Sequence, residues 1–234
     1  MEVSIIITTY KRKEQFKNAL FSAINQLFNC EFEIIVVDDN GRNEYTNYVK
    51  KTIDEFNSSK VKLVAHEINS NGAVARNSGI KNSNGKYICF LDDDDIYHND
   101  KIQKQYNFMR INNQFDASYC WRYQKGIEIK GSLSGDLSRE ILLEEFTPTT
   151  PCLMFTRQSL DDIGGFNETF LRHQDYELLL KFFKNGYKIN YLPKLLVTIG
   201  YNEGENVLTG KKLIYNKLKF LNEFEEIIDF INHS

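Results

Sequence analysis

The chain has 234 residues, of which 41% are hydrophobic, 13% aromatic and 26% charged, so it can bury a sizeable core. This composition excludes a disordered tail or a fibre, and the length corresponds to one large domain or about one and a half average ones. The 29 basic and 32 acidic residues are well mixed and give a formal net charge of −3. No basic face for nucleic acid is therefore expected.

The N-terminal segment, residues 1–13, is apolar over only a few positions, so we expect no secretory leader. No run of about 18 apolar residues occurs, so no transmembrane segment is predicted. The four cysteines, Cys30, Cys89, Cys120 and Cys152, are far apart and form no CxxC pair. Such cysteines are typical of small buried side chains in a reducing compartment, and we predict a cytoplasmic protein.

The first half of the chain alternates strand and helix signals. Four runs are short, apolar and rich in β-branched residues, as in strands buried on both faces: residues 3–8, 33–37, 61–64 and 86–91. Between them, apolar side chains recur at helical spacing over residues 16–27, 45–56 and 73–80. This alternation predicts an α/β fold with a mostly parallel central sheet flanked by helices, Rossmann-like in this half. Such sheets bind ligands beyond the carboxyl ends of their strands.

The second half is less regular and predicts a mixed arrangement. We expect helices at about 102–109 and 173–185, a hairpin over 116–130, and strands at 151–155 and 187–192. Because no hinge-like linker interrupts the chain, we predict a single domain over residues 1–205. Its two halves are residues 1–114, approximately, and 115–205.

An amphipathic helical tail is predicted for residues 206–234. Its apolar side chains lie on one broad face, with basic residues in the first half and acidic residues in the second. Three uses fit this pattern: packing on the parent domain, a homodimer contact, and peripheral docking on a membrane through the basic half, which the acidic half opposes. The polar loop at 201–206 either closes over a ligand or serves as a connector.

Four consecutive aspartates, Asp92 to Asp95, directly follow the fourth predicted strand. Carboxylates this close repel one another in a partly buried site, and a divalent cation relieves the repulsion. The alternative is a solvated acidic turn. Asp38 and Asp39 end the second strand in the same way, either as turn or cap formers or as acceptors for a ligand's ring N–H. These clusters indicate one shared cleft at the sheet edge.

Five motifs occur in order along the chain. They are VSIIITTYKR from Val3, VVDDN from Val36, NGAVARNSGI from Asn71, FLDDDD from Phe90 and RHQDYE from Arg172. With these spacings they resemble the family 2 glycosyltransferases of GT-A fold, and the resemblance covers about residues 3–200. It implies that the first half binds a nucleotide-sugar and that the second half holds the acceptor and the catalytic base.

The resemblance implies roles for residues of the first half. Thr8, Tyr10 and Arg12 would line the nucleotide pocket, with Tyr10 packed on the base. Asp39 would accept a hydrogen bond from N3–H of uracil, and Arg76 would lie near the nucleotide.

The aspartate run would supply the metal site. Asp92 and Asp94 would form a D-x-D pair, in which Asp94 holds a Mn²⁺ or Mg²⁺ ion that bridges the diphosphate. Asp93 or Asp92 would touch the ribose or the donor sugar. A diphosphate leaving group needs its developing charge stabilised, which such an ion does as a Lewis acid.

Asp175 aligns with the catalytic base, which takes the proton of the acceptor hydroxyl. Its structural alternative is a carboxylate stabilised by a helix N-terminus. The family often carries Glu-Asp here, whereas this chain has Gln174 and so lacks a neighbouring charge. Thr149, Thr150 and Cys152 lie where the family builds its acceptor wall. His173 would either contact an acceptor or phosphate or be structural, and Trp121 would either stack on a sugar or be buried or partly buried in the core.

The predicted function is an inverting, metal-dependent glycosyltransferase. It would move a sugar from a UDP-sugar to a hydroxyl of a saccharide or lipid-linked saccharide, in the biosynthesis of a capsule- or lipopolysaccharide-like surface polysaccharide. A sugar-phosphate nucleotidyltransferase would want a glycine-rich loop, which residues 8–12 lack. The remaining alternative is a non-catalytic nucleotide-sugar-binding or scaffold subunit of a glycan-assembly complex. The location would be cytoplasmic, either free or peripheral at the inner face of the membrane.

Overall fold

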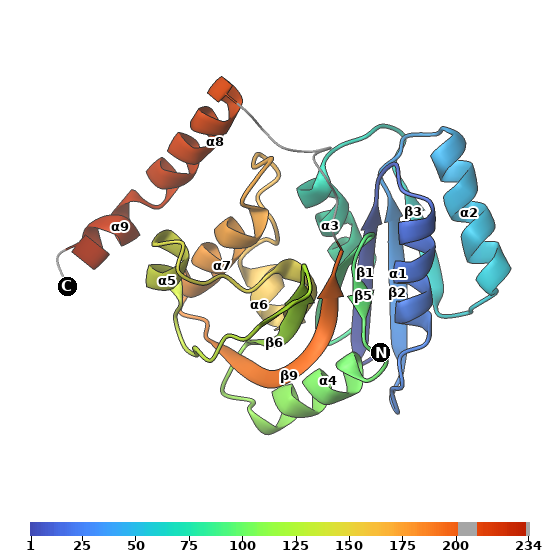
Figure 1. Cartoon of the computed structure of the whole chain (residues 1–234), viewed down its shortest axis with the longest axis horizontal. Coiled ribbons are helices and arrows are strands. Elements are labelled where there is room, and N and C mark those ends of the chain that lie inside the picture. Colours follow the sequence, from blue (N-terminus) through green and yellow to red (C-terminus); the bar gives the residue numbers. More distant parts are fainter. Residues whose placement is uncertain (201–209, 233–234) are drawn as a thin grey trace.

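Four parallel strands form the first half of the chain in the computed structural model, which describes residues 1–200 and 210–232 (Figure 1). The strands are β1 (Val3–Thr9), β2 (Phe32–Asp38), β3 (Val61–Ala65) and β4 (Tyr87–Asp92), hydrogen-bonded in the order β3-β2-β1-β4. The helices between them are α1 (Glu14–Ile24), α2 (Glu44–Phe56) and α3 (Gly72–Lys81). All seven elements predicted for this half are confirmed.

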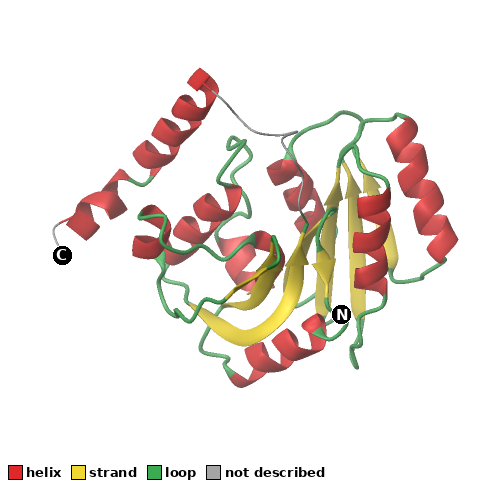
Figure 2. Cartoon of the chain, in the orientation of Figure 1, coloured by secondary structure: helices red, strands yellow, loops and turns green. Residues whose placement is uncertain are grey.

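The helices of the first half cover both faces of its sheet. α1 and α2 pack against each other on one side, and α3 packs on β1 and β2 from the other (Figures 1 and 2). The isoleucines and valines of β1 and β2 are buried between these layers, which explains their continuous apolar runs. Gly79 of α3 permits this packing, because a Cβ there would lie 2.3 Å from Cγ2 of Ile6.

Mixed pairing extends the sheet through the second half. The strands are β5 (Ile96–Tyr97), β6 (Ala117–Gln124), β7 (Ile127–Ile129), β8 (Leu153–Thr156) and β9 (Ile189–Ile199). The full order is β3-β2-β1-β4-β8-β6-β9-β5, with β7 paired to β6 as the predicted hairpin. β8 is antiparallel to both its neighbours, and β9 is parallel to β6. The helices are α4 (Lys101–Ile111), α5 (Ser138–Leu142), η1 (Thr150–Cys152), α6 (Arg157–Asp162) and α7 (Gln174–Lys184).

Short elements account for most of what the sequence did not predict here. β5, α5 and α6 have two to six residues, too few to display a period. The strand predicted to end at 192 continues to Ile199 as β9. Its pairing with β6 is irregular between Cys120 and Arg122, beside Pro193, which has no N–H to donate. The strand therefore continues past the irregular pairing, beyond the point where the sequence predicts its end.

The tail contains α8 (Gly210–Glu223) and α9 (Glu225–Asn232), which stand beside α5 and α7 in Figure 1. Phe220 is buried, and its ring contacts those of Phe170, His173 and Tyr176. Lys219 Nζ donates to the carbonyl and hydroxyl oxygens of Thr169 at 3.0 and 2.7 Å. Part of the tail thus packs on the parent domain, while its dimer and membrane roles stay predictions. The loop at 201–206 lies outside the described residues.

None of the helices in the described part of the chain has the length and apolar character needed to cross a membrane.

Candidate active site

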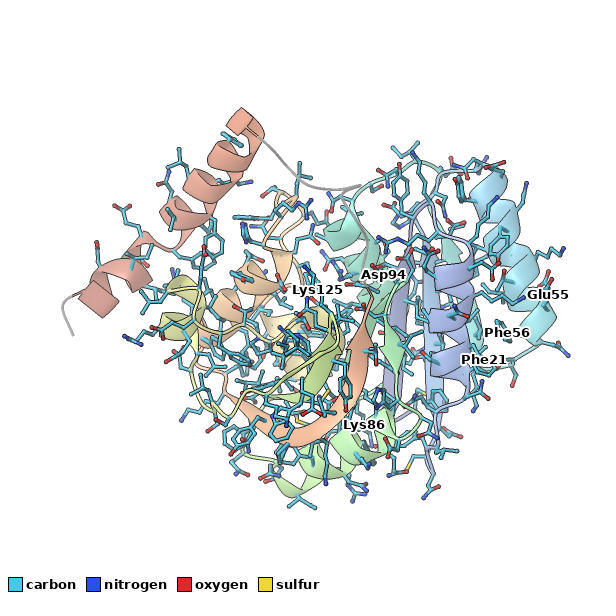
Figure 3. All side chains as sticks on the ribbon, in the orientation of Figure 1. Phe21, Glu55, Phe56, Lys86, Asp94 and Lys125 are labelled. Carbon is cyan, nitrogen blue, oxygen red and sulfur yellow. The ribbon has the colours of Figure 1, made fainter. Side chains whose placement is uncertain are left out.

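A cavity of about 570 Å³, here called the first cavity, lies beyond the carboxyl ends of β1, β2 and β4. Strand register explains its position, because β1 pairs Thr8 with Asp92 on one side and Thr9 with Asp38 on the other. Figure 3 labels Asp94 at this edge of the sheet. Every residue with a predicted donor or metal role lines this cavity: Thr8, Tyr10, Arg12, Asp39, Arg76, Asp92, Asp93 and Asp94.

Arg12 and Asp93 join the loop after β1 to the loop after β4. Nη1 of Arg12 donates to Oδ1 of Asp93 at 2.6 Å and lies 3.0 Å from Oδ1 of Asp94. The backbone N–H of Tyr10 donates to the other oxygen of Asp93 at 3.0 Å. Burial raises the pKa of Asp93 to about 6, although Arg12 opposes the rise. Two strand ends are thereby held together by one carboxylate.

Arg76 of α3 joins the first half to α7. Its Nη2 donates to Oδ1 of Asp92 at 2.6 Å, and its Nη1 donates to Oε1 of Gln174 at 2.8 Å. Burial acts to lower the pKa of Arg76, but the charge and hydrogen bond of Asp92, together with the charges of Asp175 and Asp95, leave the pKa raised. Gln174, at the position where the family often has Glu, accepts this hydrogen bond as a neutral amide.

The carboxylate of Asp39 receives four hydrogen bonds from within the protein. Oδ1 accepts from Nδ1 of His66 at 2.8 Å and from the N–H of Ser70 at 2.9 Å. Oδ2 accepts from Nδ2 of Asn69 at 2.8 Å and from the N–H of Asn71 at 3.1 Å. A carboxylate offers about four lone pairs, so uracil N3–H would have to displace one of these donors. The predicted direct contact stays a prediction, and the observed role of Asp39 is to hold the loop before α3.

His66 and Asn69 both hold the Asp39 carboxylate, and Asn69 also lines the cavity. His66 follows β3, and its Nε2 lies 2.8 Å from Oγ of Ser78 on α3. This contact fixes the imidazole ring that donates to Asp39. Asn69 lines the cavity with its amide nitrogen engaged by Asp39. Its Oδ1 accepts no hydrogen bond from the residues that the structure describes, so an acceptor of fixed orientation remains available to a ligand.

A second cavity of about 310 Å³ adjoins the first and contains Asp175. Arg76, Asp92, Asp94 and Arg172 line both cavities, so the predicted metal site lies at their junction. Thr149, Thr150 and His173 also line the second cavity, as their predicted acceptor roles require.

Asp175 stands in the first turn of α7, where it is half-buried. Its Oδ1 accepts from the N–H of Tyr176 at 3.1 Å. Burial raises the pKa of Asp175, and the nearby Arg76 guanidinium reduces but does not cancel the rise. A carboxylate with a raised pKa is a stronger base once ionised, which suits the acceptance of a proton.

Asp95 positions the end of β9 against the aspartate run. Its Oδ1 accepts from the N–H of Gly200 at 2.8 Å. A Cβ at Gly200 would lie 2.0 Å from the carbonyl oxygen of Asp94, so only glycine permits this approach. Burial, together with the charges of Asp92 and Asp94, raises the pKa of Asp95 well above its ordinary value.

The carboxylates fit a divalent ion that is shared with a ligand. In the described parts of the chain, no group of three or more His, Cys, Asp or Glu side chains could enclose a metal. Mg²⁺ is held by one or two carboxylates plus substrate phosphates, and Asp92 and Asp94 at the junction offer that donor set. Asp94 would have to exchange its contact with Arg12 for the ion.

Two of the residues considered for acceptor contacts lie away from both cavities. Cys152 is fully buried and lines neither cavity. Trp121 donates its indole N–H to the carbonyl of Gly131 at 2.7 Å and also lines neither cavity. The buried position predicted for Cys152 is confirmed, and Trp121 is partly buried.

The sequence-based selection omitted residues that the loops bring to the site. Asn69 and His66 come from the segment after β3. The predicted site residues at strand ends all lie at β1, β2 or β4. Arg172 begins one of the motifs that carry the family resemblance, but the resemblance gave this residue no role. The rule that parallel strand ends share one edge could have indicated the first two.

Comparisons with known proteins identify relatives of this chain. The family described as "Glycosyl transferase family 2" matches residues 4–179. The amylovoran biosynthesis glycosyltransferase AmsB of Erwinia amylovora is 29% identical over 197 residues, which cover 79% of this chain and 65% of that protein.

Solved structures share the fold. S. aureus TarS 1-349 in complex with UDP-GlcNAc has a TM-score of 0.73 at 23% identity, covering 88% of this chain and 60% of that one. The mannosyltransferase PcManGT from Pyrobaculum calidifontis, in complex with GDP-Man and Mn²⁺, has a TM-score of 0.70 at 16% identity, covering 88% and 58%. The chain thus spans 58–65% of the length of these relatives. The predicted GT-A fold, with a mostly parallel sheet flanked by helices, is confirmed.

Proposed function

The chain belongs to glycosyl transferase family 2, and from this we propose that it moves a sugar from a UDP-sugar to a hydroxyl of a saccharide or lipid-linked saccharide acceptor. The observation that carries the proposal is the junction of two cavities at Asp92 and Asp94, with Asp175 in the second. TarS, which has the same fold, is solved with UDP-GlcNAc, and this supports a uridine donor. Surface-polysaccharide biosynthesis follows from the family resemblance, and AmsB is named for the biosynthesis of amylovoran.

The first cavity would hold the donor. Tyr10 and Thr8 would contact the nucleoside, and Arg12 would face the diphosphate together with Arg76. Because Asp39 uses its acceptor positions on the loop before α3, it would act through Asn69, whose free Oδ1 would accept the N3–H of uracil. Cytosine has no N–H at N3, so this contact would discriminate between the two pyrimidines.

Asp94 would hold the divalent cation, with Asp92 beside it. When bound, Mn²⁺ or Mg²⁺ stabilises negative charge on a leaving diphosphate. Asp93 stays paired to Arg12 and would keep the two loops in position around the ribose and donor sugar.

The second cavity would hold the acceptor, with Asp175 as the general base. The carboxylate would accept the proton of the attacking hydroxyl, while the diphosphate occupies the first cavity on the opposite side of the anomeric carbon. Attack from the side of Asp175 displaces the leaving group directly and therefore inverts the anomeric configuration. The half-buried position of Asp175 limits its contact with water and holds it ready for the hydroxyl.

Calorimetric titration tests the donor half of the proposal. UDP, GDP and dTDP are titrated into the parent protein with Mn²⁺ and after EDTA treatment. We expect selective binding of UDP that depends on metal, and a loss of roughly tenfold or more in affinity for Asp94→Asn, because a cation ligand is removed. Asp161→Asn, an exposed carboxylate outside both cavities, is the matched control. Absence of nucleotide binding to the folded parent protein would instead indicate a scaffold subunit.

A further inference from the structure

Arg172 lies where the two cavities meet, and it differs from the other arginines there. Arg12 is paired with Asp93 and Asp94, and Arg76 with Asp92. The half-buried guanidinium of Arg172 forms no ion pair or hydrogen bond with any part of the chain that the structure describes. A partly buried cation without a partner is costly, so a ligand anion at this position would be favourable.

The segment that carries Arg172 is held on both sides. Before it, Phe170 is buried, and its carbonyl accepts from Nε2 of Gln174 at 2.7 Å. After it, His173 has a φ of 57°, in the left-handed region that is unfavourable for a residue with a side chain. The His173 ring packs between those of Tyr176 and Phe220, which stabilises this conformation. Arg172 is therefore placed at the junction by packed neighbours on each side.

The surroundings of Arg172 specify what it can bind. Its planar guanidinium presents parallel N–H groups that match the oxygens of a phosphate. Asp92 and Asp94 share its two cavities but are paired with Arg76 and Arg12, so neither carboxylate engages the N–H donors of Arg172. We propose that Arg172 binds a phosphate group at the junction, supplied either by the β-phosphate of the donor or by a phosphate on the acceptor. This inference rests on the proposed function.

Binding measurements on Arg172→Gln test the proposal and distinguish the two sources. The donor arm compares UDP with UMP in the presence of Mn²⁺, since UMP lacks the β-phosphate. The acceptor arm titrates glycerol 3-phosphate, with glycerol as reference, into protein saturated with UDP and Mn²⁺. Arg172→Lys retains the charge without the planar fork, and Arg110→Gln removes an exposed arginine of α4 that lines neither cavity. Thermal unfolding shows whether each variant is folded.

Two results would support the proposal. If the donor supplies the phosphate, Arg172→Gln weakens UDP binding roughly tenfold or more and leaves UMP binding within about twofold. If the acceptor supplies it, UDP binding is unchanged and the binding of glycerol 3-phosphate is lost. In either case Arg172→Lys retains part of the affinity and Arg110→Gln retains all of it.

The inference would be overturned if Arg172→Gln bound UDP as the parent does and if glycerol 3-phosphate bound equally to both proteins or to neither. That result would leave the proposed function intact. A folded parent protein that binds no UDP would overturn the proposed function and this inference together.

Discussion

The two cavities differ in how their charged side chains are satisfied. In the first, Asp39, Asp92 and Asp93 each accept hydrogen bonds from protein donors, and two arginines are held among them. In the second, Asp175 accepts from the N–H of Tyr176, its neighbour in α7. At the junction of the two cavities, Arg172 has no charged partner within the described chain. We infer that the donor side is organised before any ligand binds, whereas Asp175 in the second cavity and Arg172 at the junction keep charged groups available for chemistry and recognition.

Removing the general base should have the largest effect, because it should strongly reduce transfer without changing donor binding in the first cavity. Asp175→Asn should lower the transfer rate by about 10² to 10⁴, the range for loss of a general base, because no carboxylate then accepts the hydroxyl proton. UDP binding should stay within a few-fold of the parent, since the first cavity is unchanged. Transfer is followed by release of UDP with a screened acceptor, and Asp161→Asn again serves as the control.

Stability provides a second readout of the same variant. The pKa of Asp175 is raised in the folded chain, so its stabilising contribution is complete below the unfolded pKa and is lost as pH rises through the folded pKa. At neutral pH the ionised carboxylate therefore favours unfolding, and Asp175→Asn should melt no lower than the parent. Loss of UDP binding by a folded Asp175→Asn protein would contradict the assignment of this residue to the acceptor side.

The proposed hydrogen bond between Asn69 and N3–H of uracil can be tested with a modified nucleotide. Parent and Asn69→Ala proteins are each titrated with UDP and with N3-methyl-UDP, which lacks the imide N–H. The parent should prefer UDP by roughly five- to tenfold, the range for one neutral hydrogen bond, and Asn69→Ala should lose most of this preference. Ser70→Ala, in the same loop, is the matched control because the Ser70 hydroxyl donates to the carbonyl of Ile68 and, among the described residues, to no other group. A preference that persists in Asn69→Ala would assign the contact to Asp39 itself.

The smallest expected effect is a shift in pH dependence. Because Asp175 must be ionised to act as a base and burial raises its pKa, the acid limb of kcat/KM should lie above the pH expected for an exposed aspartate. Gln174→Glu adds a neighbouring negative charge, which should move that limb to still higher pH. The profile is measured for both proteins, with folding checked at each pH by circular dichroism. An identical acid limb in the two proteins would mean that another group controls it.

The first half of the fold could be predicted because its signals are local. Each of β1, β2 and β4 contains a run of apolar residues and ends at a polar residue, and the helices between them have two or more turns. Parallel strands bring their carboxyl ends to one edge, so the grouping of Thr8, Asp39 and Asp92 followed from topology alone. β5 and α5 could not be found this way, because elements so short are stabilised by tertiary contacts rather than by their own periodicity.

The amino-acid order was sufficient for the family, for the α/β sheet and for the residue types at the site, because these depend on apolar periods and motif spacing along the chain. The partners of each charged group depended on folding. Three such results are that Gln174 accepts from Arg76, that Asp39 holds Asn69, and that Arg172 has no charged neighbour in the described chain. They depend on how segments up to 98 residues apart pack together. Hydrogen bonds act over about 3 Å, so only the packed structure brings such groups within reach.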